Sequence, residues 1–342
     1  MCSSDLKEND INRSRIVGGR AMLRLDPGDG WTVDIGGVYQ ATRLDDAQYA
    51  DRSGPPLTRK SAVVEGAQAH YGMATLVLRK DWGDIRFQSS NAYVNHALDE
   101  SFDARPNGDT PQIFDQRNRT RMFSSETRLW RPVRNGVGWV LGFSAIDNRT
   151  EQRRAFQQLI ETERATGVTN TISELTGYGK ISLEPLRGLI LTGGGRVTSS
   201  RLGGIAKDVQ PRYAAEAAAG AGITGERTES EVLPSAEILG HVTRNLSVYA
   251  RYEEGFRPGG LAIETNFVRR FRNDHVTSWE VGARLGAPGD IIAANLSLAH
   301  SNWTDIQASF IDCNGLLTTA NIGNGRIPSI AGSPTIEPTA RL

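Results

Sequence analysis

The chain is dominated by long segments in which apolar and polar residues alternate, and the run LSVYARY shows this most clearly. Leu246, Val248 and Ala250 alternate there with polar neighbours, and SWEVGARL repeats the pattern from Ser278. A period of two residues places the two sets on opposite faces of a β-strand. The pattern predicts strands with one apolar and one polar face. It leaves open whether a protein core or lipid covers the apolar face.

The alternating segments form pairs that are joined by short turns, and longer polar stretches separate one pair from the next. In the turn at Asn135-Gly136, the two residues supply the positive φ that a tight hairpin needs. The predicted pairs are 13–26 with 31–45, 70–80 with 85–102, 119–133 with 137–153, 171–186 with 189–206, 229–242 with 246–256, and 275–286 with 290–310. A further strand is predicted to begin near Thr318. Short turns that alternate with long loops are typical of outer-membrane barrels.

Strand length and aromatic placement favour the same interpretation. Many of these segments exceed the length of about 5 to 6 residues that is usual in globular sheets, and such length suits a tilted strand that crosses a bilayer. Tryptophans near the strand ends are candidates for interfacial girdles, although ordinary packing explains each of them equally well. These residues are Trp31, Trp82, Trp130, Trp139, Trp279 and Trp303.

Composition excludes several classes of function. Lys plus Arg number 39 and Asp plus Glu number 39, so no overall charge favours nucleic acid as a partner. No run approaches the roughly 18 consecutive apolar residues of a transmembrane helix. The two cysteines, Cys2 and Cys313, lie near opposite ends of the sequence, so neither a disulfide framework nor a zinc site is expected.

Four segments taken together resemble a known family. SVYARYEEGFRPGGL, SWEVGARL, NLSLAHSNWTDIQASF and TANIGNGRI are similar, in order and spacing, to the C-terminal half of the barrel of TonB-dependent outer-membrane receptors. The similarity is sharpest from Leu246 to Ile327. It implies an all-β fold, an antiparallel up-and-down transmembrane β-barrel with long extracellular loops and short periplasmic turns. About thirteen strands are predicted, against the 22 of the family's barrel.

The resemblance also sets the expected domain organisation. Residues 1–10, which begin MCSSDL, are interpreted as a non-native or disordered start. Residues 11–342 are predicted to form a partial barrel domain without the family's N-terminal plug and without its last strands. No signal peptide is predicted, because the start lacks a charged segment followed by an apolar one.

The function that the resemblance implies is import rather than bond chemistry. Family members are outer-membrane receptors of Gram-negative bacteria that bind a scarce solute such as a ferric siderophore, and the TonB complex supplies energy through the plug. The expected partners are therefore outer-membrane lipid, the TonB complex and a small iron chelate, and no cofactor or enzyme activity is expected. Three alternatives remain open: a passive porin, an autotransporter-type barrel, and a soluble all-β carbohydrate-binding protein or enzyme.

Two groups of charged residues are candidates for functional roles. The first lies on the polar faces of strands and is a candidate lumen wall: Glu126, Arg128, Glu237, Arg251, Glu253, Glu280 and Arg284. The second is a candidate ligand loop in and after FRPGG: Arg257, Arg269, Arg270 and Arg272. Simpler explanations are the ordinary polar side of alternating strands for the first group and a solvated, flexible loop for the second.

The remaining patterns in the sequence do not indicate a binding or catalytic site. GAGITG at residues 220–225 matches a dinucleotide fingerprint, but the strand–helix context that this fingerprint requires is missing. The five histidines show no metal-ligand spacing. QRRAFQQLIETER, at residues 152–164, has a helical composition and is predicted to form a turn or two of helix within a loop.

Overall fold

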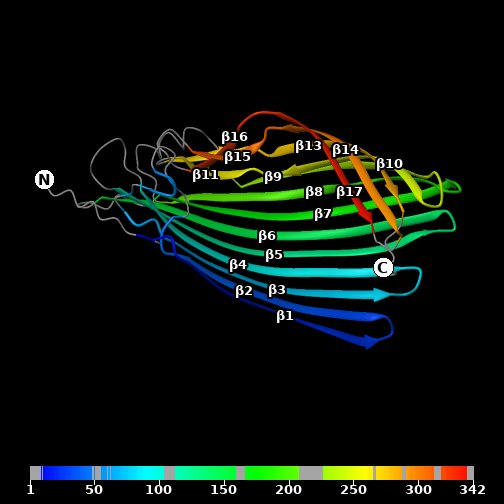
Figure 1. Cartoon of the computed structure of the whole chain (residues 1–342), viewed down its shortest axis with the longest axis horizontal. Helices are drawn as coiled ribbons and strands as arrows, with labels where there is room; N and C mark the ends of the chain where they lie inside the picture. The colour runs from blue at the N-terminus through cyan, green and yellow to red at the C-terminus, as the bar shows by residue number, and fades with distance from the viewer. Residues whose placement is uncertain are drawn as a thin grey trace.

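The sheet is a single curved wall of antiparallel strands. The computed structural model describes residues 9, 11–47, 50, 55–59, 61, 63–103, 112–158, 166–207, 226–264, 267–286, 290–311 and 317–336. Thirteen strands form one sheet in the order β1 to β10, β13, β14 and β17, and each strand pairs with the one before it in that order (Figure 1). The predicted antiparallel up-and-down architecture is confirmed.

The strands of the main sheet are long. Their bounds are β1 Ser14–Gly28, β2 Trp31–Leu44, β3 Ala67–Asp81, β4 Arg86–Asp103, β5 Gln112–Arg134, β6 Val137–Gln158, β7 Thr166–Leu186, β8 Leu189–Lys207, β9 Arg227–His241, β10 Leu246–Arg257, β13 Asp274–Leu285, β14 Ile292–Thr304 and β17 Gly325–Ile336. The edge strands β1 and β17 do not pair with each other. The barrel is therefore not closed by these strands alone.

Short turns gather at one end of the sheet (Figure 1). The Asn135-Gly136 turn has φ values of 53° and 79°, as the sequence predicts for a tight hairpin. We call the other end of the sheet the rim. Two small hairpins lie there, β11 (Gly260–Glu264) with β12 (Phe267–Phe271), and β15 (Gln307–Ile311) with β16 (Leu317–Asn321).

Two predicted elements differ from the structure. Residues 152–158 continue strand β6 instead of starting a helix, and the rest of the predicted helix lies outside the described residues. The strand persists because Gln152 to Gln158 pair with Asn118 to Gln112 of β5, and this ladder outweighs a weak helical propensity. The predicted strand 290–310 ends at Thr304, where Asp305 has a φ of 51°, and residues beyond it form the β15–β16 hairpin.

The two faces of the sheet differ in chemistry. Large apolar side chains stay exposed on one face, which we call the apolar face; examples are Leu141 at 60%, Phe143 at 52% and Ile181 at 59% exposed. The alternate residues form the polar face. Because an exposed apolar band is costly in water and favourable in lipid, the faces match the predicted membrane-facing and hydrated sides of a barrel wall.

The tryptophans divide between these faces. Trp31 and Trp82 lie near the turns and make edge-to-face contacts with Phe87, at 6.4 and 6.5 Å between ring centroids. Those positions suit an interfacial girdle. In contrast, an arginine guanidinium lies 4.9 Å from the ring of Trp130 and another lies 5.8 Å from the ring of Trp303, on the polar face, where packing explains both residues.

Candidate ligand-binding face

The polar face is the concave one. Lys180 on β7 reaches Glu253 on β10 with an Nζ–Oε1 distance of 3.3 Å, although β8 and β9 lie between these strands. The intervening register positions carry Gly194 and Ser235, whose small size leaves room for the long side chains. Neighbouring strands are about 4.8 Å apart, so this contact needs a sheet that curves towards the polar side.

Arg251 lies between two carboxylates in one row of the polar face. Its register partners are Glu237 on β9 and Glu280 on β13. The guanidinium Nη2 is 2.7 Å from Oε2 of Glu280. Opposite charges at directly paired positions stabilise a sheet modestly, and here one cation offsets two anions.

Two tyrosines of the polar face cover strand glycines, one beside this row and one on β7. Tyr249 lies over Gly282, where an added Cβ would be 2.6 Å from the ring, and its hydroxyl donates a 2.5 Å hydrogen bond to Glu280. Tyr178 lies over Gly142 in the same way and donates a 2.6 Å hydrogen bond to Glu126. An aromatic ring over a strand glycine fills the space that a side chain would occupy and fixes the register.

The structure places every candidate wall residue on the polar face, in two groups. Glu126 and Arg128 lie on β5, while Glu237, Arg251, Glu253, Glu280 and Arg284 lie on β9, β10 and β13. Arg128 packs 4.9 Å from the ring of Trp130, and Arg284 packs 4.9 Å from the ring of Tyr249. Their role as a lumen wall stays a prediction.

A charge swap tests the Arg251 row. Arg251→Glu would place three carboxylates at paired positions, and we expect it to lower the free energy of unfolding by about 1 kcal/mol. Adding Glu280→Arg should restore most of that loss, because the ion pair is re-formed in the opposite direction. Urea unfolding in lipid vesicles measures both changes. Additive losses in the double variant would show that the pair is not coupled.

The first rim hairpin folds back over the polar face instead of forming a flexible loop. Strands β11 and β12 contribute Leu261, Ile263 and Val268, which are 7%, 0% and 1% exposed. These side chains form a small apolar core with Val168 of β7. We call β11–β12 the inner hairpin. This buried core differs from the solvated, flexible loop that was the simpler explanation for the arginines in and after FRPGG.

Two polar side chains of the wall hold the inner hairpin. The amide of Asn170 on β7 accepts a 2.9 Å hydrogen bond from the Leu261 nitrogen and donates a 2.8 Å bond to the Leu261 oxygen. Arg154 on β6, 3% exposed, donates from Nη1 to the Ile263 oxygen at 3.0 Å. The hairpin backbone is thereby bonded to the wall at two points.

A polar chain continues from Arg154 along the rim. Its Nε donates to Oε1 of Gln116 at 2.9 Å, and Nε2 of Gln116 is 3.3 Å from Oε2 of Glu100. Burial raises the pKa of the Glu100 carboxyl, and the hydrogen bond from Gln116 opposes this shift. Glu100 lies near the rim end of β4, beyond the apolar band.

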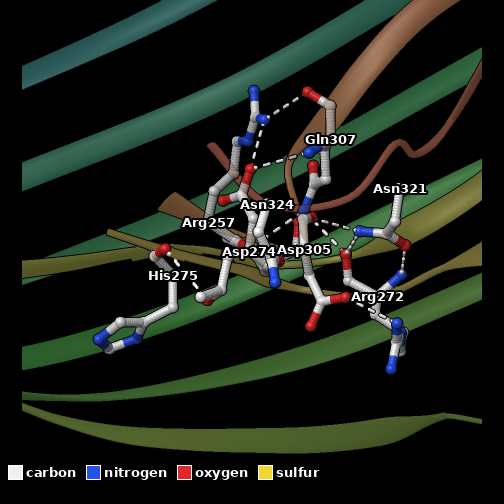
Figure 2. Close-up of polar contacts among 10 residues, drawn as sticks. Arg257, Arg272, Asp274, His275, Asp305, Gln307, Asn321 and Asn324 are labelled. Carbon is white, nitrogen blue, oxygen red and sulfur yellow. Dashed lines mark hydrogen bonds and ion pairs between the residues drawn. The ribbon is translucent and has the colours of Figure 1, made fainter. Parts of the chain in front are cut away.

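A network at the hairpin stems joins the two rim hairpins (Figure 2). Nε2 of Gln307 lies 3.1 Å from each of three carbonyl oxygens, those of Arg257, Pro258 and Arg272. Asn321 accepts a 2.7 Å bond from the Arg272 nitrogen and donates a 3.0 Å bond to the Arg272 oxygen. The start of β15 and the end of β16 are thus bonded to both ends of the inner hairpin.

Two of the candidate ligand arginines belong to this network. Arg257 lies 2.6 Å from Asp274, which is 3% exposed, and Arg272 lies 2.6 Å from Asp305. The others, Arg269 and Arg270, are exposed on β12. The charges of Arg257 and Arg272 are partly neutralised at the base of the hairpin.

Sequence reasoning missed the partners in this network. Asp274, Gln307 and Asn321 were not singled out, although Gln307 and Asn321 lie within NLSLAHSNWTDIQASF and TANIGNGRI. Those segments carried the family resemblance. In the fold these segments contact the residues around FRPGG. Their shared resemblance to the family was the feature of the sequence that could have pointed to this network.

Other candidate chemistry is sparse. In the part of the chain that the structure describes, no group of three or more His, Cys, Asp or Glu side chains has an arrangement that could hold a metal ion. The same residues include no helical segment with the length and hydropathy of a membrane span. The GAGITG sequence lies outside the described residues.

Comparisons with known proteins agree with this architecture. The sequence matches the family described as TonB dependent receptor-like, beta-barrel, over residues 4–328. The ferric yersiniabactin uptake receptor FyuA from Yersinia pestis is similar in structure, with a TM-score of 0.73 and 18% identity, over 94% of this chain and 49% of that one. The siderophore receptor PiuA from Acinetobacter baumannii gives 0.70 and 12%, over 97% and 56%. No curated protein matches the chain.

A third similar structure is the unliganded ferric citrate transporter FecA, with a TM-score of 0.68 and 14% identity, over 95% of this chain and 48% of that one. The chain therefore spans about half the length of the solved structures that it resembles. At these identities the likeness concerns the fold of the strands.

Proposed function

Because the chain belongs to the TonB-dependent receptor β-barrel family, we propose that it forms part of the wall of a receptor in a Gram-negative outer membrane, and that this receptor imports an anionic metal chelate such as a ferric siderophore. The TonB complex would supply the energy through a plug inside the barrel. Residues 11–342 would act as one portion of the barrel domain. The receptor catalyses no bond chemistry.

One observation carries the proposal. The wall is apolar on one face and charged on the concave face, and the inner hairpin at its rim has exposed arginines. The apolar face suits lipid and the charged face suits a hydrated passage. Arg269 and Arg270 are exposed on β12 at the rim, and we propose that an entering solute meets them there. Cations at a concave entrance attract anions and raise their local concentration.

The names of similar structures support an iron chelate as the solute, and they also show how widely the fold is used. FyuA is named as a ferric yersiniabactin uptake receptor and FecA as a ferric citrate transporter. A copper transporter, OprC, has a TM-score of 0.63 with this chain at 13% identity. The proposal therefore extends to the chemical class, an anionic metal chelate, and not to one compound.

Uptake of radioactive iron tests the function. Cells that lack their own ferric receptors would express the intact receptor that contains this chain, and would be offered ferric citrate and a panel of ferric siderophores. We expect accumulation of at least one chelate, abolished when TonB is deleted. Passage that continues without TonB would support a passive porin instead, and failure to accumulate any ferric chelate would contradict an iron chelate as the solute.

A further inference from the structure

The inner hairpin is attached both to the wall and to the second rim hairpin. Loops at the rim of a barrel ordinarily have high mobility, because few buried contacts hold them. Here the hairpin has an apolar core against β7, hydrogen bonds from Asn170 and Arg154 of the wall, and a hydrogen-bond network at its stem.

We propose that the inner hairpin is a fixed platform rather than a mobile lid, and that Asn170 and Gln307 are positioning residues that hold Arg270 above the polar face for an anionic chelate. The inference rests on the proposed function for the ligand. The platform itself rests on the contacts. Neither Asn170 nor Gln307 needs to touch the solute.

The wall-side attachment acts through the backbone of β11. The Asn170 side chain mimics a strand partner, because its oxygen accepts from the nitrogen of Leu261 and its nitrogen donates to the oxygen of the same residue. A Cβ at the neighbouring Gly204 would lie 3.0 Å from Cγ of Leu261, so only glycine leaves room for Leu261 to sit against the wall. Position and orientation of β11 are therefore both set by the wall.

The stem-side attachment acts through the second hairpin. Gln307 begins β15, and its side chain spans both ends of the inner hairpin by approaching the oxygens of Arg257 and Arg272 (Figure 2). Its own backbone takes part as well, since its nitrogen donates to Asp274 at 3.2 Å and its oxygen accepts from Arg257 at 2.8 Å. One residue thus ties the stem of the inner hairpin to β15.

The arginines of this region have two different roles in the proposal, one structural and one in ligand binding. Asp274 and Asp305 partly neutralise Arg257 and Arg272 at the stem, where those cations stabilise the hairpin base. Arg270 is exposed on β12, beyond the stem network. A charge on a held platform binds an anion more tightly than the same charge on a free loop, because less conformational entropy is lost on binding.

Trypsin and ferric citrate test the platform together. Trypsin cleaves after Arg269 and Arg270 only when the hairpin opens locally, so the rate of cleavage there reports the opening equilibrium. In the intact receptor in detergent, we expect Asn170→Ala to raise this rate at least about tenfold, and Gln307→Ala to act in the same direction. Gln68→Ala, at an exposed position of β3 away from the hairpin, is the matched control and should change nothing.

Ferric citrate affinity, measured by quenching of tryptophan fluorescence, gives the second readout. We expect both Asn170→Ala and Arg270→Gln to weaken binding, but Arg270→Gln should leave cleavage after Arg269 unchanged. The double variant should bind no more weakly than Arg270→Gln alone, because Asn170 acts through Arg270. Additive losses would mean that Asn170 contacts the ligand itself and would overturn the positioning role.

The two proposals fail in different ways. If the wild-type receptor binds ferric citrate and neither Asn170→Ala nor Gln307→Ala alters cleavage or affinity, the platform is wrong while the proposed function stands. If the wild-type receptor does not bind ferric citrate, this chelate is excluded as its ligand. Independently of binding, cleavage of the wild-type hairpin as fast as that of Asn170→Ala would overturn the platform. Should Asn170→Ala block assembly, Gln307→Ala carries both readouts.

Discussion

Replacement of Leu141 by Arg is expected to prevent stable assembly of the sheet in a membrane. Leu141 is 60% exposed in the apolar stripe of β6 and pairs with Leu129 of β5. An arginine on the lipid face costs about 2 to 4 kcal/mol near the bilayer midplane. The total stability of most proteins is only about 5 to 15 kcal/mol, so one such change removes a large share of it.

Ser144→Arg is the matched control, because it adds the same charge on the same strand but on the polar face. Ser144 pairs with Glu126, so the new cation would meet a carboxylate in a hydrated environment. We expect this variant to unfold in urea at nearly the wild-type concentration, while Leu141→Arg shifts the midpoint strongly or fails to fold in lipid vesicles. Equal losses in both variants would show that the apolar face does not meet lipid.

The main sheet was predictable because its signals are local. Alternation fixes which residues share a face, and an Asn-Gly pair fixes a turn, so neither requires knowledge of distant residues. Arg251 and Glu280 were assigned to one face by alternation alone, and the structure pairs them at 2.7 Å. The charged wall was therefore visible in the sequence before its contacts were known.

The rim hairpins were not predictable in the same way. Strands β11 and β12 are short, and their buried residues Leu261 and Ile263 are covered by contacts with β7, which lies far away in the sequence. The hydrogen bonds between Asn170 and Leu261 join residues that are 91 positions apart. Nothing in a local pattern shows such contacts, so the sequence predicts only a loop in and after FRPGG.

The helical interpretation of residues 152–164 failed for a related reason. Gln and Arg favour a helix only weakly, by a few tenths of a kcal/mol per residue. Strand β6 gains a continuous ladder with β5 and β7 as far as Arg154. Pairing with neighbours that are already in place outweighs a propensity of that size.

Replacement of Arg59 by Met should release the segment between β2 and β3. The Arg59 side chain is 6% exposed; its Nη2 lies 2.6 Å from Oδ1 of Asp46, and it also pairs with Glu65. Both carboxylate side chains are buried, at 9% and 2% exposed. Removal of the cation from a buried ion pair costs about 3 to 5 kcal/mol, because the carboxylates stay behind without it.

Hydrogen exchange and a charge-matched rescue separate this effect from simple loss of contacts. The amides of Glu65 and Asp103 are bonded to the carboxylates of Asp46 and Glu65 at 2.9 and 2.7 Å, so they should exchange faster in Arg59→Met. Adding Asp46→Asn and Glu65→Gln should recover much of the protection, because the buried charge is then removed. Arg43→Met breaks an exposed pair with Asp45 and should cost under about 1 kcal/mol. If Arg43→Met and Arg59→Met were equally harmful, burial would not be what makes the Arg59 cluster important.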